Sequence, residues 1–149
     1  MRVKDCMTKQ VITVAAGEPV TVAARLMARY NVGALPVRDL DGRVEGIVTD
    51  RDILLRCIAA DRSPAAMRVR EVMSGHVKSV APDTDASAAA AIMAERQVRR
   101  LPVLEQGHLA GIVSLADLGR RPDYRMEMAE ALSDICAGVR RLDGEDASF

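Results

Sequence analysis

Apolar residues recur along this chain at two different spacings. The β-branched runs "VITV" (11–14) and "VKSV" (77–80) are typical of short strands. Each run precedes a stretch in which small apolar residues recur at helical spacing. Pro19 suits the first helical position of one stretch, and Asp83 or Thr84 can cap the other. The inner faces that this spacing predicts are Val20, Ala23, Ala24 and Met27 in the first helix, and Ala86, Ala89, Ala90 and Met93 in the second.

Each half of the chain also contains a pair of apolar runs on either side of a turn with glycine. This arrangement predicts a β-hairpin in each half. Thr49 and Ser114 end the second run of each pair and open a further helix, which we expect to reach about Ala60 in the first half. The runs and turns are "ALPVRD", "DLDG" and "VEGIVT" in the first half, and "RLPVLE", "EQG" and "LAGIVS" in the second.

The two halves are copies of one unit. "VGALPV" (32–37) aligns with "VRRLPV" (98–103), and after the deletion of one residue in the turn "GIVTDRD" (46–52) aligns with "GIVSLAD" (111–117). Chance does not produce such a register over a long stretch of sequence, so the chain is a tandem duplication. The predicted order of elements is strand, helix, strand, strand, helix, and it occurs twice.

This order places the chain in the α/β (α+β) class. One unit alone would leave a sheet face bare, so we expect two small sheets that pack together, followed by a C-terminal helix. The sequence divides into a first repeat (1–60), a linker (61–68, "DRSPAAMR"), a second repeat (69–120) and a C-terminal helix with a tail (121–149).

The C-terminal helix has an apolar seam, and Asp123 can cap it. The seam has two interpretations: the helix covers the core of its own chain, or it packs against a partner subunit. The residues of the seam are Met128, Leu132, Ile135, Val139 and Leu142.

Composition limits what the protein can bind and indicates where in the cell it works. The 149 residues carry 21 basic and 21 acidic side chains, so no net charge attracts nucleic acid or an anionic membrane. The start, "MRVKDCMTKQ", lacks the apolar run of a secretory signal, and the most apolar stretch, "ASAAAAIMA", is far too short to span a membrane. Three cysteines without CxxC spacing suit reduced thiols. We therefore expect a cytoplasmic protein.

The doubled strand-to-helix motif is the candidate site. Thr49 with Asp52, and Ser114 with Asp117, fit the capping-box pattern, in which both side chains satisfy free amides at a helix start. The same geometry also suits a nucleoside phosphate, because the hydroxyl and free amides can hold phosphate while the carboxylate holds the ribose diol. The recurrence of the motif in both halves favours a binding site.

The tandem pattern, with "LPV" and then "GIVTDRD" or "GIVSLAD" in each copy, resembles a pair of cystathionine-β-synthase-type (CBS) domains, the Bateman module. The resemblance covers about residues 1 to 120. It implies clefts between the copies that bind adenosine ligands such as AMP, ADP, ATP, S-adenosylmethionine or NAD. It also implies that Asp52 and Asp117 hold ribose hydroxyls, that Thr49 and Ser114 approach phosphate, and that the base pocket is lined by Thr13, Ser79, Leu35, Pro36, Leu101 and Pro102.

The copies differ where phosphate would lie. Arg51 lies inside the first motif, whereas Arg100 precedes the second "LPV". Guanidinium groups match phosphate geometry, so these two arginines are our expected phosphate ligands, with a solvated surface charge as the alternative for each. We expect the two sites to be unequal.

Other chemistry finds little support. The sequence contains no P-loop, no GxGxxG and no GxSxG pattern, and His76 and His108 lack the spacing of metal ligands. We therefore expect no enzyme activity, no metal and no cofactor beyond the regulatory ligand. The expected function is a regulatory module that senses adenosine ligands, forms a two-fold symmetric homodimer and controls a separate protein. The alternatives are a ligand-free scaffold or dimerisation module and, third, a small enzyme.

Overall fold

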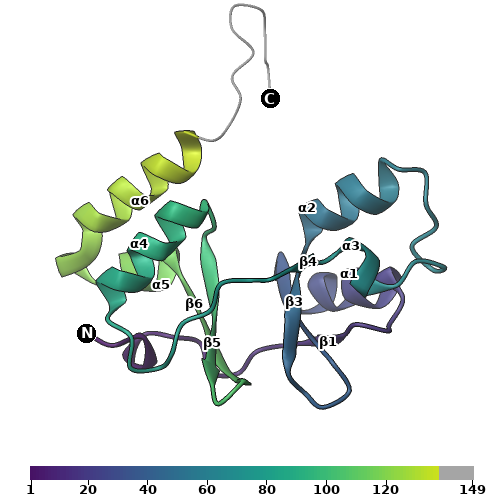
Figure 1. Ribbon diagram of the computed structural model, residues 1–149. Helices are drawn as coiled ribbons and strands as arrows, with labels where there is room; N and C mark the ends of the chain where they lie inside the picture. The colour runs from purple at the N-terminus through teal and green to yellow at the C-terminus, as the bar shows by residue number, and fades with distance from the viewer. Residues whose placement is uncertain (138–149) are drawn as a thin grey trace, which may run out of the picture.

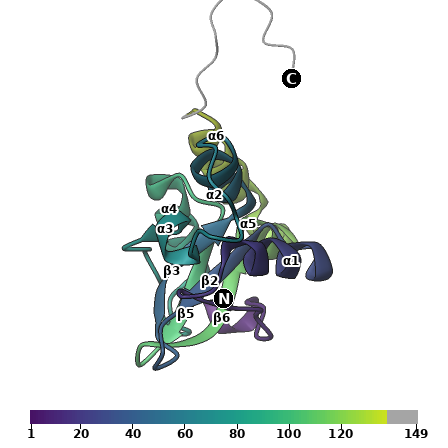
Figure 2. The ribbon, with the colours of Figure 1, turned by 90° about the vertical axis from the view of Figure 1, so that its right-hand side faces the viewer.

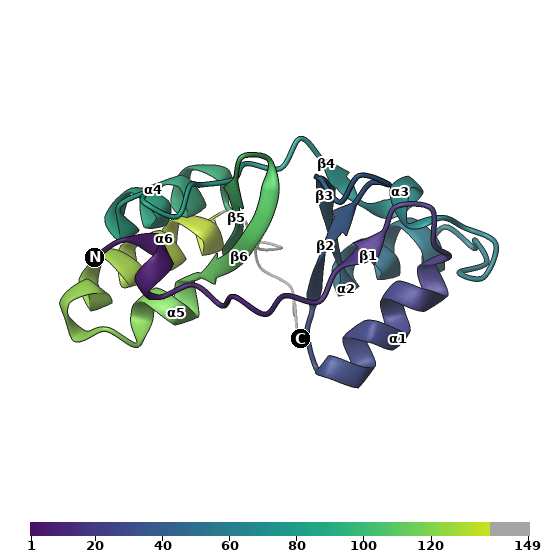
Figure 3. The same ribbon diagram turned by 90° about the horizontal axis from the view of Figure 1, so that it is seen from below.

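The computed structural model describes residues 1–137, and in it the chain forms two lobes (Figure 1). Each lobe contains a small sheet, and helices cover the face of that sheet that points away from the other lobe (Figures 1 and 3). The expected α+β fold, with two small sheets and a C-terminal helix, is confirmed. No described helix has the length and apolar character to cross a membrane.

The first lobe has a four-stranded sheet in the order β1-β2-β3-β4. Strand β1 runs parallel to β2, and the hairpin β2–β3 and the pair β3–β4 are antiparallel. The predicted first strand at 11–14 was too long, because pairing begins only at Val14. The bounds are β1 (Val14–Ala15), β2 (Ala34–Arg38), β3 (Val44–Thr49) and β4 (Ser74–Gly75).

The second lobe contains the antiparallel hairpin of β5 (Arg100–Glu105) and β6 (His108–Ser114). The predicted strand at 77–80 is wrong, because only Val80 pairs there, through one isolated bridge to β5. The two hairpins point the same way in the molecule (Figures 1 and 2).

The long helix of each repeat lies where its apolar spacing predicts. Helix α1 (Val20–Tyr30) buries Val20, Ala23 and Met27, and Ala24 is half-buried. Pro19 is the N-cap of α1 and not its first helical residue. The predicted inner face of α4 (Ala86–Arg96) is buried in full.

The cap of α4 differs from the prediction. Asp85 caps the helix, where the sequence suggested Asp83 or Thr84. Its carboxylate accepts a hydrogen bond of 2.9 Å from the amide of Ser87, and this bond satisfies one of the free amides of the first turn. The other helices are η1 (Val3–Asp5), α2 (Asp50–Ile53), η2 (Leu54–Ile58), α3 (Val69–Val72), α5 (Leu115–Gly119), η3 (Pro122–Tyr124) and α6 (Arg125–Ala137).

Each lobe has its own core, and the repeats exchange short segments between these cores. Val3, at the start of the first repeat, is fully buried in the core of the second lobe. Val69 and Val72, at the start of the second repeat, are fully buried in the core of the first lobe, together with Met67 from the segment expected to be a linker. The two lobes are therefore tied together by chain that crosses in both directions (Figure 3).

The C-terminal helix α6 packs on α4 and α5 of the second lobe (Figure 1). Met128 is buried in the second core, and Ile135 packs against it, whereas 48% of Leu132 is exposed. Helix α6 thus covers the core of its own chain. It begins at Arg125, after the η3 turn that contains Asp123, so Asp123 is not its cap. Two seam residues, Val139 and Leu142, lie outside the described residues.

Candidate functional site

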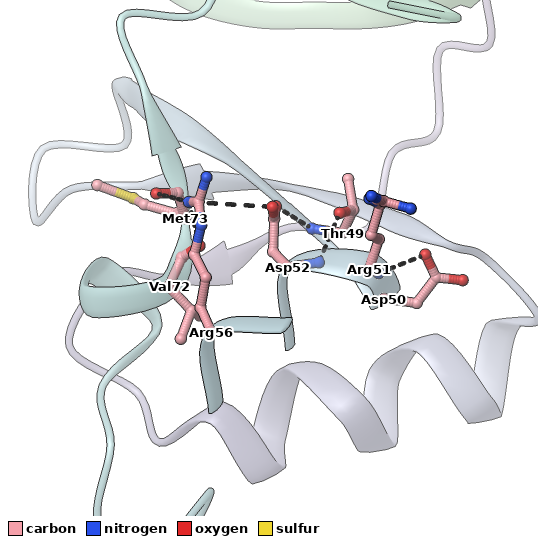
Figure 4. Close-up of polar contacts among 7 residues, drawn as sticks. All are labelled: Thr49, Asp50, Arg51, Asp52, Arg56, Val72 and Met73. Atoms are coloured by element: carbon pink, nitrogen blue, oxygen red, sulfur yellow. Dashed lines mark hydrogen bonds and ion pairs between the residues drawn. The ribbon is translucent and has the colours of Figure 1, made fainter. Parts of the chain in front are cut away.

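The two strand-to-helix motifs both form capping boxes. Thr49 Oγ1 accepts a hydrogen bond of 3.1 Å from the amide of Asp52, whose carboxylate accepts one of 2.9 Å from the amide of Thr49 (Figure 4). In the second copy Ser114 and Asp117 form the same pair of bonds, at 3.2 and 2.8 Å. The motif therefore starts α2 and α5 as its spacing predicts.

The two motif carboxylates differ in their surroundings. In the second copy the Ser114 hydroxyl also donates to Asp117, at 2.7 Å. In the first copy the free oxygen of Asp52, Oδ1, lies 3.9 Å from the guanidinium of Arg56 (Figure 4). Arg56 in turn donates to the carbonyl oxygens of Val72 and Met73, at 2.8 and 3.0 Å. The first motif is thereby connected to the segment that leads into β4.

A cleft of about 550 Å³ lies between the two lobes at the first motif. Its size is in the range of small-molecule sites. Three parts of the chain form it: the end of β3 with the start of α2, the segment that crosses to the second lobe (74–78), and the end of α4 with the start of β5. The lining residues are Gly33, Ile47, Thr49 to Asp52, 74 to 78, and 96 to 101.

The cleft brings together five of the residues that the sequence singled out. Thr49, Arg51 and Asp52 line it from the first repeat, and Arg100 and Leu101 line it from the second. Ser114 lies at a different groove, which also reaches Arg100. The remaining predicted residues line neither space; they are Thr13, Leu35, Pro36, Ser79, Pro102 and Asp117.

Burial explains why some of these side chains do not reach the cleft. Leu35 is completely buried in the first core, and Pro36 is buried beside it in β2. Pro102 is buried at the matching place in β5. Leu35 therefore packs in the core of the first lobe, and the two prolines are buried within their strands.

Several residues of the cleft were missed by the sequence analysis. Asp50 lies inside the first motif, and Arg96 and Arg99 lie just before β5. His76 and Lys78 reach the cleft because β4 pairs with β3 of the other repeat and carries the next residues past the first motif. The sequence positions of Asp50, beside Thr49, and of Arg99, beside Arg100, gave a signal that could have been used.

Arg100 is the cation of the cleft with the least access to water. Its side chain is half-buried, and this burial is the main reason why the pKa of Arg100 is lowered. The nearby charge of Arg99 lowers the pKa a little further, whereas the carboxylates of Asp50 and Asp117 raise it. Within residues 1–137 its guanidinium forms neither a hydrogen bond nor an ion pair. A half-buried cation without a partner favours an anion in the cleft, because an opposite charge offsets the cost of desolvation.

The described residues offer no metal site. Within residues 1–137, no three His, Cys, Asp or Glu side chains are grouped so that they could hold an ion.

A family model of the CBS domain matches the chain twice, at residues 3–58 and 69–121. The chain belongs to the CBS domain family. Among curated CBS proteins it is similar to the CBS domain-containing protein YhcV of Bacillus subtilis, with 42% identity over 89% of this chain and 94% of that protein.

Solved CBS structures share the fold. The CBS domain protein TA0289 of Thermoplasma acidophilum matches with a TM-score of 0.81 and 30% identity, over 90% of this chain and 75% of that one. The CBS domain pair of protein MJ0100, solved in complex with 5′-methylthioadenosine and S-adenosyl-L-methionine, matches with a TM-score of 0.73 and 26% identity, over 80% of this chain and 94% of that one.

Proposed function

We propose that this protein is a regulatory module that binds an adenosine ligand in the cleft between its two CBS repeats. The observation that carries the proposal is the composition of that cleft. A hydroxyl and a carboxylate at one helix start, Thr49 and Asp52, share it with the half-buried Arg100 of the other repeat. These groups match the ribose and the phosphate of a nucleotide.

Each group has a role in this proposal. Asp52 keeps one oxygen, Oδ1, outside the capping box, and that oxygen accepts from a ribose hydroxyl. Arg51 and Arg100 bind phosphate from opposite walls, since guanidinium groups pair with phosphate through two parallel hydrogen bonds. Val98, which lines the cleft and is 38% exposed, offers an apolar surface to the ligand. AMP, ADP and ATP fit this set best, with S-adenosylmethionine and NAD as further candidates.

The related CBS pair of MJ0100 supports an adenosine ligand. That protein was solved with 5′-methylthioadenosine and S-adenosyl-L-methionine, both of which contain adenosine. Neither compound carries phosphate, whereas the present cleft is lined by Arg51, Arg96, Arg99 and Arg100. We therefore expect this chain to prefer a phosphorylated adenosine.

Ligand binding would act through the arrangement of the repeats. The cleft is lined by both repeats and by the segment that connects them. A ligand that contacts all three favours the arrangement in which they close on it, and a separate protein reads that arrangement. The three cysteines, Cys6, Cys57 and Cys136, are all free, which supports a reducing compartment such as the cytoplasm.

The first test is direct. The protein is purified without added nucleotide, denatured and analysed for small molecules by mass spectrometry, and the refolded or dialysed protein is titrated with AMP, ADP, ATP, S-adenosylmethionine and NAD by calorimetry. We expect a bound adenosine compound or saturable binding of at least one of the five. No bound compound and no binding would favour a ligand-free scaffold. Turnover of a bound compound would favour a small enzyme.

Substitution of the motif carboxylates separates binding from capping. Asp52→Asn keeps an oxygen for the capping box but loses the charge that holds ribose, so we expect about 10- to 100-fold weaker nucleotide binding with near-normal stability. Asp117→Asn is the matched control, because Asp117 does not line the cleft. Calorimetric titration and thermal unfolding of both variants decide the question. Unchanged affinity in Asp52→Asn would show that the carboxylate only caps its helix.

A further inference from the structure

A second groove, of about 640 Å³, lies between the second motif and helix α6. We call it the α6 groove. One wall is the end of β6 and the start of α5, the opposite wall is the first two turns of α6, and two arginines from the start of β5 lie beside them. The lining residues are Arg99, Arg100, Ser114, Leu115, Ala116, Gly119, Arg125, Met128, Ala129 and Leu132.

The polar lining of the α6 groove is cationic. Arg99, Arg100 and Arg125 line it, and no carboxylate does. None of the three guanidinium groups forms an ion pair within residues 1–137. Arg125 is also the first residue of α6, where the positive end of the helix dipole disfavours a cation. An anion in the groove would offset the repulsion among the three guanidinium groups and the unfavourable interaction of Arg125 with the helix dipole.

The rest of the lining is apolar. Leu115 and Met128 are buried at the back of the groove, and 48% of Leu132 is still exposed. Ala116 and Ala129 add small side chains that leave room above this surface. A ligand with an apolar body could cover Leu132, with the gain that comes from removing apolar area from water.

The α6 groove does not suit a ribose. Its motif carboxylate, Asp117, is outside the lining, and one oxygen of that carboxylate already accepts from both the amide and the hydroxyl of Ser114. No acceptor of full negative charge faces the groove to hold a diol. The ligand class therefore differs from that of the cleft at the first motif.

We propose that the α6 groove binds a small amphipathic anion. Arg99, Arg100 and Arg125 hold its oxyanion head, a phosphate or a carboxylate, and Met128 and Leu132 pack against its aliphatic or aromatic body. Helix α6 lies beyond the residues that match the CBS family model, which end at 121, so one wall of this groove comes from outside the two repeats. The proposal does not depend on an adenosine ligand in the other cleft.

The experiment uses n-octyl phosphate below its micellar concentration, with 1-octanol and inorganic phosphate as probes that each lack one half of it. Calorimetry with the full chain should show octyl phosphate binding about tenfold or more tightly than either partial probe, since the groove pairs charge with apolar surface. Arg125→Gln and Leu132→Ser should each weaken octyl phosphate binding. Arg25→Gln, an exposed arginine on α1 of the other lobe, should leave it unchanged.

Titration of the same variants with AMP keeps the two proposals apart. Arg125 and Leu132 line only the α6 groove, so we expect the AMP affinity of both variants to equal that of the parent. Octyl phosphate binding that depends on Arg125 supports the α6 groove even if AMP binds nowhere. Equal binding of octyl phosphate and octanol, or equal octyl phosphate affinity in the parent and both folded groove variants, would overturn the proposal.

Discussion

The glycine that opens each motif is required by a close approach of backbone. A Cβ atom on Gly46 would overlap the carbonyl oxygen of Ser74, which belongs to the crossing segment of the other repeat. A Cβ atom on Gly111 would lie 2.7 Å from the carbonyl oxygen of Thr8, which crosses in the opposite direction. In both copies the absent side chain lets a segment of one repeat pair with the motif strand of the other.

Gly46→Ala tests this close approach. The added methyl group must push β4 away from β3, so we expect the free energy of unfolding to fall by about 1 to 3 kcal/mol. Gly119→Ala is the matched control, because nothing lies within 4 Å of its Cβ position at the end of α5. Urea unfolding measures both variants. Equal midpoints for Gly46→Ala and the control would contradict this explanation of the glycine.

At the scale of elements, one side chain joins the first helix start to the segment that crosses between the lobes. Arg56, in η2, donates to the carbonyl oxygens of Val72 and Met73 and faces the carboxylate of Asp52 (Figure 4). The next residues, Ser74 and onward, form a wall of the cleft. Arg56 is therefore placed to hold the crossing segment against the first motif.

Arg56→Gln should loosen that connection. The variant loses two hydrogen bonds from a charged donor that is partly exposed, so we expect about 0.5 to 1.5 kcal/mol less stability. Amide hydrogen exchange should become faster at residues 74–78. Arg121 occupies the same place in the second repeat and has no side-chain hydrogen bond within residues 1–137, so Arg121→Gln should change stability by less than about 0.5 kcal/mol. Similar losses of stability in both variants would show that Arg56 does not hold the crossing segment in place.

At the scale of the whole molecule, apolar side chains remain exposed on the side opposite the hairpins. Leu54, Leu55 and Ile58 of α2 and η2 are 57%, 49% and 50% exposed. Helix α6 lies on the same side of the molecule (Figures 1 and 2). Such helical faces support the proposal that two chains join through a two-fold symmetric interface.

The dimer proposal predicts a mass of about twice the 16.1 kDa chain in light scattering at tens of micromolar. Leu55→Glu would place a charge in the interface and should shift the mass to that of one chain. Leu40→Glu is the control, because Leu40 is fully exposed in the turn of the first hairpin, away from these helices. A parent protein that scatters as a single chain would rule the dimer out.

The sequence by itself determined the duplication, both hairpins, the inner faces of α1 and α4, and the capping boxes that start α2 and α5. These features depend on residues close together along the chain. Thr49 and Asp52, for example, satisfy each other's amides within one turn, and the spacing of two such residues is visible in the sequence. The short strands were less well determined, because Val14 and Val80 pair only when a partner strand from elsewhere in the chain reaches them.

Only the tertiary structure decided which groups face the cleft and which do not. His76 and Lys78 enter it because a segment of the second repeat pairs with β3 of the first. No local sequence pattern predicts a pairing between segments so distant in sequence. The family resemblance assigned Leu35 to a base pocket, but the side chain is completely buried, because packing of its own sheet determines where it points. The apolar seam of α6 was visible in the sequence. Whether that seam packs on the core of its own chain or on a partner subunit depended on long-range contacts, which spacing along one helix does not specify.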